Sequence, residues 1–404
     1  MKKSFGKLIG TVLLPCMMIS LLAGCGTKNT GNTSKTSGNA ETNGTEISET
    51  EATYMIGGIG PLSGEAAIYG QAVKNAAEMA VKEINEAGGV NGYQISFKME
   101  DDEHDPEKAV NAYNSLKDWG MKLLMGTVTS GPCTAVVAKS SADNMFQLTP
   151  SATAVDSIAF DNAFRVCFSD PNQGSASAVY IGTKGLAKKV AVIYDSSEIY
   201  SSGIYETFVA EAANQPFEIV AEEAFTAESS KDFTVQLQKA KDAGAELVFL
   251  PIYYQAASLI LKQADTMGYD PLFFGCDGLD GLLSVENFDT TLAEGVMLLT
   301  PFVANAQDNA TTKFVEAYKN TYGDTPNQFA ADAYDAIYIM KAALEKSGVA
   351  PDASVSDICE AMKTAMTQIS YEGVTGSITW TADGEPTKNP NAMVIVDGVY
   401  KSME

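Results

Sequence analysis

The sequence predicts an α/β fold with two central sheets of parallel strands, each covered by helices on both faces. Short, continuously apolar runs such as 190–194 and 247–252 alternate with amphipathic stretches of helical length. Continuous apolar runs are typical of strands buried on both faces, and strands that alternate with helices favour parallel pairing. The chain from residue 53 to residue 404 has room for two such sheets of about five or six strands each.

The bounds of the individual elements follow from the apolar runs, from the amphipathic stretches and from helix-capping residues. Gly88-Gly89 ends the first helix, and Asp105-Pro106 supplies an N-cap and a first helical residue for the second. In the first part of the chain, the predicted strands are 54–59, 95–99, 122–125 and 146–149, and the predicted helices are 69–87, 106–118 and 132–143. In the middle, the predicted strands are 190–194, 219–225, 247–252 and 272–275, and the predicted helices are 202–214, 230–243 and 255–267. Three helices at 308–322, 329–347 and 354–368 then precede short strands at 377–381 and 393–396.

The composition excludes several functional classes. Lys and Arg number 27 against 51 Asp and Glu, which gives a formal net charge of −24, whereas a nucleic-acid binder needs a basic face. His104 is the one histidine of the chain, so a multi-histidine metal site is excluded and a Ser-His-Asp triad would depend on that residue. The hydrophobic content of 45% is enough for buried cores and excludes a largely disordered chain.

The N-terminal segment predicts export and a lipid anchor. A basic N-terminus is followed by an apolar stretch at 8–22, which is shorter than a transmembrane helix requires. The run LAGC at 22–25 resembles the lipobox of bacterial lipoproteins, which implies cleavage of a signal peptide at 1–24 and a lipid on Cys25. The alternative is an ordinary signal peptide or a weak membrane helix. Residues 25–52 are polar and therefore predict a flexible linker between the anchor and the folded part.

Four cysteines follow the linker: Cys133, Cys167, Cys276 and Cys359. No two are close enough in the sequence for a C-x-x-C redox or zinc motif. An exported chain permits disulfide pairing, but we expect most of these cysteines to be free and partly buried.

Two motifs suggest chemistry that their surroundings do not support. Gly58-x-Gly60 lies between a strand and a helix, as in a dinucleotide fingerprint, but Ser63 stands where the third glycine is required. The acidic run 101–105 offers oxygen ligands but lacks the glycine of a calcium loop, so we interpret it as a strand end and a helix cap. We therefore expect no cofactor and no metal, and no catalytic role for His104.

Three segments directly after predicted strands contain polar side chains: 127–131, 149–153 and 274–278. Ligands bind at the carboxyl ends of strands in open α/β sheets. Hydroxyl groups and free backbone N–H groups near helix N-termini suit a carboxylate, and the isolated acidic residue Asp277 suits an ammonium group. From the residues alone, these segments are either a ligand site or ordinary capping loops.

A series of strings in order resembles the leucine/isoleucine/valine-binding proteins, the extracytoplasmic receptors of branched-chain amino-acid ABC importers. They are GIGPLSGEAAIYGQAVKNAAEMAVKEINEAGGVNG, EDDEHDPEKAV, GTVTSG, TPSATA, RVCFSDPNQG, VAVIYDSS, KDFTVQLQKAKDAGAELVFLPIYY, GCDG and GSITW. The resemblance covers essentially all of residues 53–404. It implies a type I periplasmic binding fold with two Rossmann-like lobes joined by hinge crossings near residues 168, 300 and 378. One lobe is then 53–168 plus 301–378, and the other is 169–300 plus 379–404.

The resemblance also implies ligand contacts. It assigns the α-carboxylate to Ser130, Ser151, Ala152 and Thr153, the α-ammonium to Asp277 in place of a glutamate, and the ligand side chain to Tyr69, Tyr200, Tyr253 and Phe329. Tyr200 needs a one-residue insertion to align, and Asp280 has no equivalent and would favour a more polar ligand. His104 and Thr129 stand where some relatives have a disulfide pair.

The implied function is a non-enzymatic, lipid-anchored receptor that closes on a neutral amino acid, with a branched-chain one favoured, and delivers it to an ABC permease and its ATPase subunits. We expect a monomer on the extracytoplasmic face of the membrane, with a Gram-positive surface favoured and a periplasm if the cell is Gram-negative. The alternatives are another small ligand in the same fold (an amide, a short peptide or an aromatic acid) and a sensory receptor.

Overall fold

The computed structural model describes residues 52–388 and 390–403. The predicted signal peptide, Cys25 and nearly all of the linker lie outside these described residues. The described part contains one five-stranded sheet, one seven-stranded sheet and a two-stranded hairpin. Short 3₁₀ turns connect several elements, at Val155–Ile158, Ala227–Ser229, Asp277–Leu279, Leu282–Ser284 and Thr290–Ala293.

The first sheet is wholly parallel, with the strand order β2-β1-β3-β4-β5. Its strands are β1 (Tyr54–Gly60), β2 (Ile95–Asp101), β3 (Leu123–Gly126), β4 (Gln147–Thr149) and β5 (Ala163–Arg165). Its helices are α1 (Ala67–Glu86), α2 (Pro106–Trp119), α3 (Ser130–Ala142), α9 (Gln328–Ser347) and α10 (Val355–Met366). We call this sheet with its helices the first sandwich.

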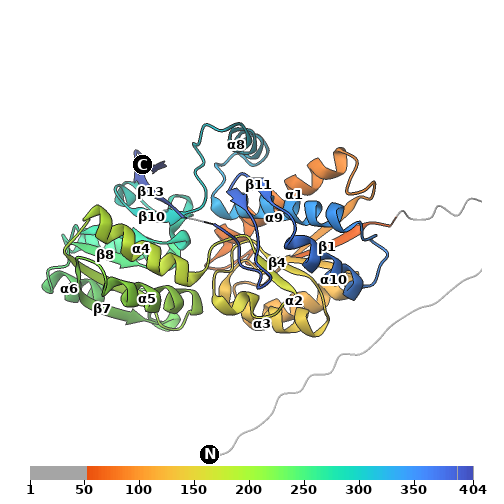
Figure 1. Cartoon of the computed structure of the whole chain (residues 1–404). Coiled ribbons are helices and arrows are strands. Elements are labelled where there is room, and N and C mark those ends of the chain that lie inside the picture. Colours follow the sequence, from red (N-terminus) through yellow and green to blue (C-terminus); the bar gives the residue numbers. More distant parts are fainter. Residues whose placement is uncertain (1–51, 389, 404) are drawn as a thin grey trace, which may run out of the picture. The chain divides into compact units, whose positions relative to one another are not determined.

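The side chains of β3 explain why the strands of this sheet read as continuously apolar. Leu123 and Met125 join the core under α1 and α9, whereas Leu124 joins the core under α2 and α3. Successive side chains of a strand point to opposite faces, so a strand that is buried on both faces needs apolar residues at every position. Figure 1 shows α2 and α3 on one side of this sheet and α1 and α9 on the other.

The second sheet has the order β14-β13-β10-β9-β8-β6-β7. Its strands are β6 (Lys189–Asp195), β7 (Glu218–Phe225), β8 (Leu247–Leu250), β9 (Leu272–Gly275), β10 (Met297–Thr300), β13 (Asn391–Val396) and β14 (Val399–Ser402). The core against one face contains residues of α4 (Asp170–Lys184) and α5 (Ile199–Ala212), and the core against the other face contains residues of α6 (Thr234–Asp242) and α7 (Tyr254–Thr266). We call this sheet with these helices the second sandwich.

The expected size of five or six strands is wrong for the second sheet, which has seven. The difference is a C-terminal hairpin: β13 pairs antiparallel with β10, and β14 pairs antiparallel with β13. Asp397 and Gly398 form its two-residue turn, with φ of 56° and 70°. Asp-Gly is a favoured pair for such a turn because both central residues need positive φ.

Several predicted boundaries also need correction. The structure adds α4, β5, β10, β11 (Tyr371–Gly373) and β14, which the sequence analysis did not predict. α3 begins at Ser130 rather than at residue 132, so the end of the polar segment 127–131 belongs to the helix. α6 begins at Thr234 instead of 230, because a 3₁₀ turn and a short connection occupy 227–233. The other predicted strands and helices are present, with ends shifted by a few residues.

The chain passes between the two sheets three times. The connections are residues 166–169, the segment from 301 to α8 (Asn309–Tyr322), and the segment that begins at residue 379 after the hairpin of β11 (Tyr371–Gly373) and β12 (Gly376–Ile378) and is described to residue 388. After the second crossing, α9 returns to pack against α1. The carboxyl ends of strands from both sheets thereby supply the loops described next.

Candidate ligand-binding site

The predicted site residues lie at strand ends or helix starts of both sandwiches. Ser130 is the first residue of α3, and Ser151, Ala152 and Thr153 follow β4. Tyr69 lies in the first turn of α1, Tyr200 is the second residue of α5, Tyr253 precedes α7, Asp277 follows β9, and Phe329 is the second residue of α9. All of these side chains are buried except that of Tyr253, which is partly exposed.

The four predicted aromatic residues form one cluster. Tyr69 stacks on Phe329 with ring centroids 4.1 Å apart, and Tyr253 stacks on Tyr200 at 4.7 Å. Tyr69 meets Tyr253 edge-on at 5.5 Å, which joins the two stacks. The sequence analysis did not include Tyr254, whose ring lies edge-on to Tyr69 at 4.8 Å. The cluster draws its rings from helices of both sandwiches and so forms a continuous apolar wall.

Asp277 is buried beside this wall. Its Oδ1 accepts a hydrogen bond of 2.7 Å from the Tyr200 hydroxyl, and its backbone N–H donates to Gln173 Oε1 at 3.1 Å. Burial raises the pKa of the Asp277 carboxyl to about 7, although the hydrogen bonds from Tyr200 and Gln173 oppose the rise. No cation is among the groups that act on Asp277, and it forms no ion pair among the described residues.

Asp170 is a second buried carboxyl that the sequence analysis missed. It is the first residue of α4, is 1% exposed, and its Oδ1 has no hydrogen-bond partner among the described residues. Its backbone N–H donates to Thr153 O at 2.9 Å, so it joins the second sandwich to the loop after β4. Burial is the main cause that raises the pKa of Asp170 well above its ordinary value, and the charge of Asp277 raises it further. The available signal was Asp170-Pro171, a helix start just after the expected crossing near 168.

The hydroxyl groups of the first sandwich are already engaged. Ser130 Oγ accepts hydrogen bonds from the backbone N–H groups of Thr153 (3.2 Å) and Ala154 (3.1 Å). Ser151 Oγ donates to Val128 O at 2.7 Å, and the Ala152 N–H donates to Thr149 Oγ1 at 2.9 Å. The backbone N–H groups expected to hold a carboxylate thus have internal acceptors in this structure. The first-turn N–H groups of α3, which include that of Ser130, have no acceptor within the helix.

Arg165 fixes the loop that follows β4. Its guanidinium is 1% exposed and donates to the carbonyl oxygens of Ala152 and Thr153. Its Nε lies 3.1 Å from a carboxylate oxygen of Glu385. The positive charge of Arg165 is therefore committed to the loop carbonyls and to Glu385.

Two other buried carboxyl groups nearby have partners. Asp280 Oδ2 accepts the Gln328 N–H at the start of α9 at 2.7 Å, and burial raises the pKa of Asp280 to about 7. Asp332 pairs with the buried Lys388 at 2.7 Å, and burial still raises its pKa to about 6. Asp280 thus has a structural role as a helix cap. Asp277 and Asp170 form no ion pair among the described residues, and Asp170 Oδ1 has no hydrogen-bond partner there.

The acidic run 101–105 ends a strand and caps a helix, as predicted. Asp101 accepts hydrogen bonds from the Leu62 N–H and from the Ser63 hydroxyl, and Asp105 caps α2 through the N–H groups of Glu107 and Lys108. His104 and Thr129, the two positions at which the resemblance implies a disulfide pair in other members, are adjacent here, since His104 Nδ1 lies 2.9 Å from Thr129 Oγ1. The four described cysteines are free, as predicted for most of them, and all are buried.

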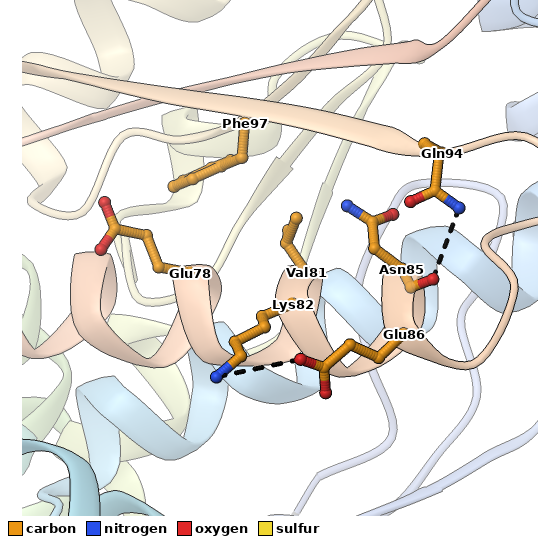
Figure 2. A pocket seen from close by; sticks show the side chains of 7 residues that line it. All are labelled: Glu78, Val81, Lys82, Asn85, Glu86, Gln94 and Phe97. Atoms are coloured by element: carbon orange, nitrogen blue, oxygen red, sulfur yellow. Dashed lines mark hydrogen bonds and ion pairs between the residues drawn. The ribbon is translucent and has the colours of Figure 1, made fainter. Parts of the chain in front are cut away.

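Two cavities differ in the residues that line them. A cavity of about 560 Å³ adjoins Tyr200 and Tyr253 and is lined by both sandwiches, with Glu65 and His104 from the first and Glu198 from the second. A depression of about 460 Å³ lies between α1 and β2 and contains none of the predicted site residues. Figure 2 shows that Lys82 and Glu86 pair with each other, and both side chains are exposed. The third charged side chain of the depression, Glu78, pairs with Lys74. The depression is therefore an ordinary solvated surface.

The described residues also limit other chemistry. Within 52–388 and 390–403, no group of three or more His, Cys, Asp or Glu is arranged to hold a metal ion. In the same part of the chain, no helix is long and apolar enough to cross a membrane.

Comparison with known proteins identifies the family. A model of the periplasmic binding protein family matches residues 53–399. The Leu/Ile/Val-binding protein homolog 3 of Brucella melitensis is 30% identical over 336 residues, which is 83% of this chain and 89% of the relative. The leucine-, isoleucine-, valine-, threonine-, and alanine-binding protein of Pseudomonas aeruginosa is 29% identical over 335 residues, 82% of this chain and 87% of the relative.

Solved structures agree with the fold. The branched-chain amino acid transporter substrate binding protein LivJ from Streptococcus pneumoniae, in complex with isoleucine, has a TM-score of 0.79 and 30% identity, and covers 87% of this chain and 98% of its own. A solute binding protein from R. palustris in complex with benzoate has a TM-score of 0.78 at 21% identity, covers 87% of this chain and 95% of its own, and shows likeness of fold alone. The chain belongs to the periplasmic binding protein family and, within it, to the leucine/isoleucine/valine-binding proteins.

Proposed function

We propose that this protein binds a neutral, branched-chain amino acid between the two sandwiches and acts as the receptor of an ABC importer. The observation that carries the proposal is the chemical contrast across the site. Asp277 and Asp170 are buried carboxyl groups without an ion pair among the described residues, and Ser130 begins α3, where the first-turn N–H groups have no acceptor within the helix. An α-amino acid brings an ammonium group for Asp277 and Asp170 and a carboxylate for the N–H groups at the start of α3.

The energetics support a ligand with both charges. A zwitterion loses its hydration in a closed site, so each charge must find a fixed partner. The wall of Tyr69, Tyr200, Tyr253 and Phe329 then takes an apolar side chain, which contributes about 1.5–3 kcal/mol for a leucine-sized group. A micromolar affinity needs a net of about 8 kcal/mol, which a few such contacts supply after ordering costs.

A carboxylic acid without an amine is the second candidate, because a solved neighbour binds benzoate. The stacked aromatic wall suits such a ring. The two buried carboxyl groups disfavour it, because a benzoate brings a negative charge to their site and no cation to pair with them. A zwitterion therefore fits the charges of the site better than an aromatic acid.

The remaining parts of the proposal concern delivery. In this proposal the protein consists of two lobes, 53–168 plus 301–378 and 169–300 plus 379–404, which close around the ligand by bending at the three crossings. A lipid on Cys25 holds the monomer at the extracytoplasmic face of the membrane, and the polar linker lets the closed receptor reach the permease and its ATPase subunits. The role is binding rather than catalysis.

Titration calorimetry of the full-length protein tests the ligand class. L-Leucine, L-isoleucine and L-valine should bind with micromolar or better affinity, while benzoate and 3-methylpentanoate (isoleucine without its amine) should bind at least about tenfold more weakly. Failure of every standard amino acid to bind a folded protein would reject the proposal. Tight binding of benzoate alone would favour the second candidate.

A further inference from the structure

His104 projects from a backbone turn that non-glycine residues seldom adopt. Glu103 and His104 have φ of 49° and 62°, both in the left-handed region. The carboxyl groups of the same run hold this turn, because the Glu103 N–H donates to Asp101 Oδ1 and the His104 N–H donates to Asp102 Oδ1, each at 2.9 Å. Strained backbone that is fixed in this way often serves a functional side chain.

The ring of His104 touches both sandwiches. Nδ1 lies 2.9 Å from Thr129 Oγ1, next to Ser130 at the start of α3. Nε2 lies 3.2 Å from Glu198 Oε2, just before α5 of the second sandwich. The ring also meets Tyr253 edge-on, with centroids 5.5 Å apart. His104 is thus a residue of the first sandwich whose charge partner and aromatic neighbour both belong to the second.

We propose that His104 and Glu198 form a proton-dependent clasp between the lobes, which holds the ligand-bound arrangement closed when His104 is protonated and releases it when His104 loses its proton. The proposal rests on the proposed function, since closure matters only if the lobes close on a ligand. His104 acts in it as a positioning residue, because it touches Tyr253 of the aromatic wall and not the charged groups of the ligand.

The charges around His104 favour its protonated form. Glu198 faces it from the second sandwich, Asp102 and Glu65 face it from the first, and Asp195 and Lys231 line the same cavity. Burial lowers the pKa of His104, but the hydrogen bond and charge of Glu198, with Asp102 and Glu65, raise it above the ordinary 6.5 overall. A group whose pKa is raised in the closed form stabilises that form below its pKa in the open form. That contribution is lost as the pH rises through the higher value, so closure weakens from about pH 6.5 upward.

The clasp is also open to solvent protons. The side chains of His104 and Glu198 are 24% and 17% exposed, and both line the cavity of about 560 Å³ beside Tyr200 and Tyr253. Water in this cavity allows exchange of the proton. Partial exposure also screens the pair, so its effect on affinity is modest, about two- to fivefold.

Proton NMR tests the contact without any ligand. Because the chain contains one histidine, the titrating imidazole signal needs no assignment. In the full-length protein, Glu198→Gln should lower the pKa of His104 by about half a pH unit or more. Glu206→Gln, an exposed carboxylate of the same helix α5, is the matched control and should leave it unchanged. An equal His104 pKa in the wild type and in Glu198→Gln would overturn the clasp.

Calorimetry with L-isoleucine then tests its effect on binding. Asp277 titrates in the same range, so the clasp is read from the ratio of the wild-type affinity to that of His104→Gln at the same pH, in which the Asp277 contribution cancels. This ratio should fall about two- to fivefold between pH 6.5 and pH 8.5, and in the Glu198→Gln background the corresponding ratio should not change with pH. A wild-type to His104→Gln ratio that does not change with pH would overturn the proposal. If no amino acid binds at any pH, the proposed function fails, while the NMR titration still decides whether the clasp exists.

Discussion

The two faces of the candidate site differ in how far the protein satisfies its own polar groups. On the first sandwich, Ser130 and Ser151 have partners within the chain, and Arg165 holds the loop carbonyls. On the second sandwich, Asp170 and Asp277 are buried without a cation, and burial raises the pKa of both carboxyl groups. One face is therefore rigid before binding, whereas the other carries an electrostatic cost that a cationic group relieves. The contrast suggests that the carboxylate of a ligand is positioned and that its ammonium group supplies most of the discrimination.

Removal of the Asp277 charge should have the largest effect. Asp277→Asn should weaken L-isoleucine binding at least about 100-fold, because loss of one partner of a buried charge pair costs about 3–5 kcal/mol. Binding of 3-methylpentanoate, which has no amine, should change little, and calorimetry of both ligands measures the ratio. Asp280→Asn is the matched control, since Asp280 is equally buried but caps α9. An equal loss for both ligands would show that Asp277 does not read the ammonium group.

The same contrast predicts that the affinity for the ligand decreases at low pH; we call this part of the pH profile the acid limb. Asp277 has a pKa of about 7 without a ligand, and a bound ammonium group lowers it. Binding then expels a proton below pH 7, so affinity should fall up to about tenfold per pH unit as the pH decreases through this range. Calorimetry in two buffers of different ionisation enthalpy measures the number of protons that are released on binding. Loss of the limb in Asp277→Asn is expected, and its persistence would assign it to Asp170 or Asp102.

Asp170 should contribute less than Asp277 to binding of the ammonium group, because no described tyrosine hydroxyl or amide aligns its free oxygen. Asp170→Asn should weaken L-isoleucine about tenfold and leave 3-methylpentanoate within about threefold. A gain in thermal stability would accompany the substitution, because it removes the burial cost of a carboxyl group whose Oδ1 has no hydrogen-bond partner among the described residues. Unchanged isoleucine affinity would restrict the ammonium site to Asp277.

The first sandwich should respond in stability more than in discrimination. Ser130→Ala leaves the N–H groups of Thr153 and Ala154 without their acceptor, which should lower the free energy of unfolding by about 1–3 kcal/mol. Denaturant unfolding measures this, and Ser141→Ala in the last turn of α3 is the control, expected within about 0.5 kcal/mol of wild type. Isoleucine and 3-methylpentanoate should lose affinity to the same degree, a few-fold. A selective loss for isoleucine would contradict the assignment of this face to the carboxylate.

The sequence predicted the sheets better than their edges. Runs such as 247–252 showed that strands are buried on both faces, because each side chain of a parallel inner strand meets a helix layer. β14 was missed although Asp397-Gly398 is a favoured hairpin turn, because the strand is short and mostly exposed or partly buried. α4 was missed because its small and polar residues give weak periodicity, although Asp170-Pro171 marks its start and Gly185 its end.

For the site, the sequence by itself determined the residue types, the family and the places where strands end. The tertiary structure decided which polar groups are already paired, because partners such as Ser130 and Thr153, or His104 and Glu198, are far apart along the chain and meet only when strand ends converge. It also decided the charge state of the acidic residues. A carboxylate is solvated in the unfolded chain. Its ionised form becomes costly only after helices and sheets exclude water from it, as they do around Asp170 and Asp277.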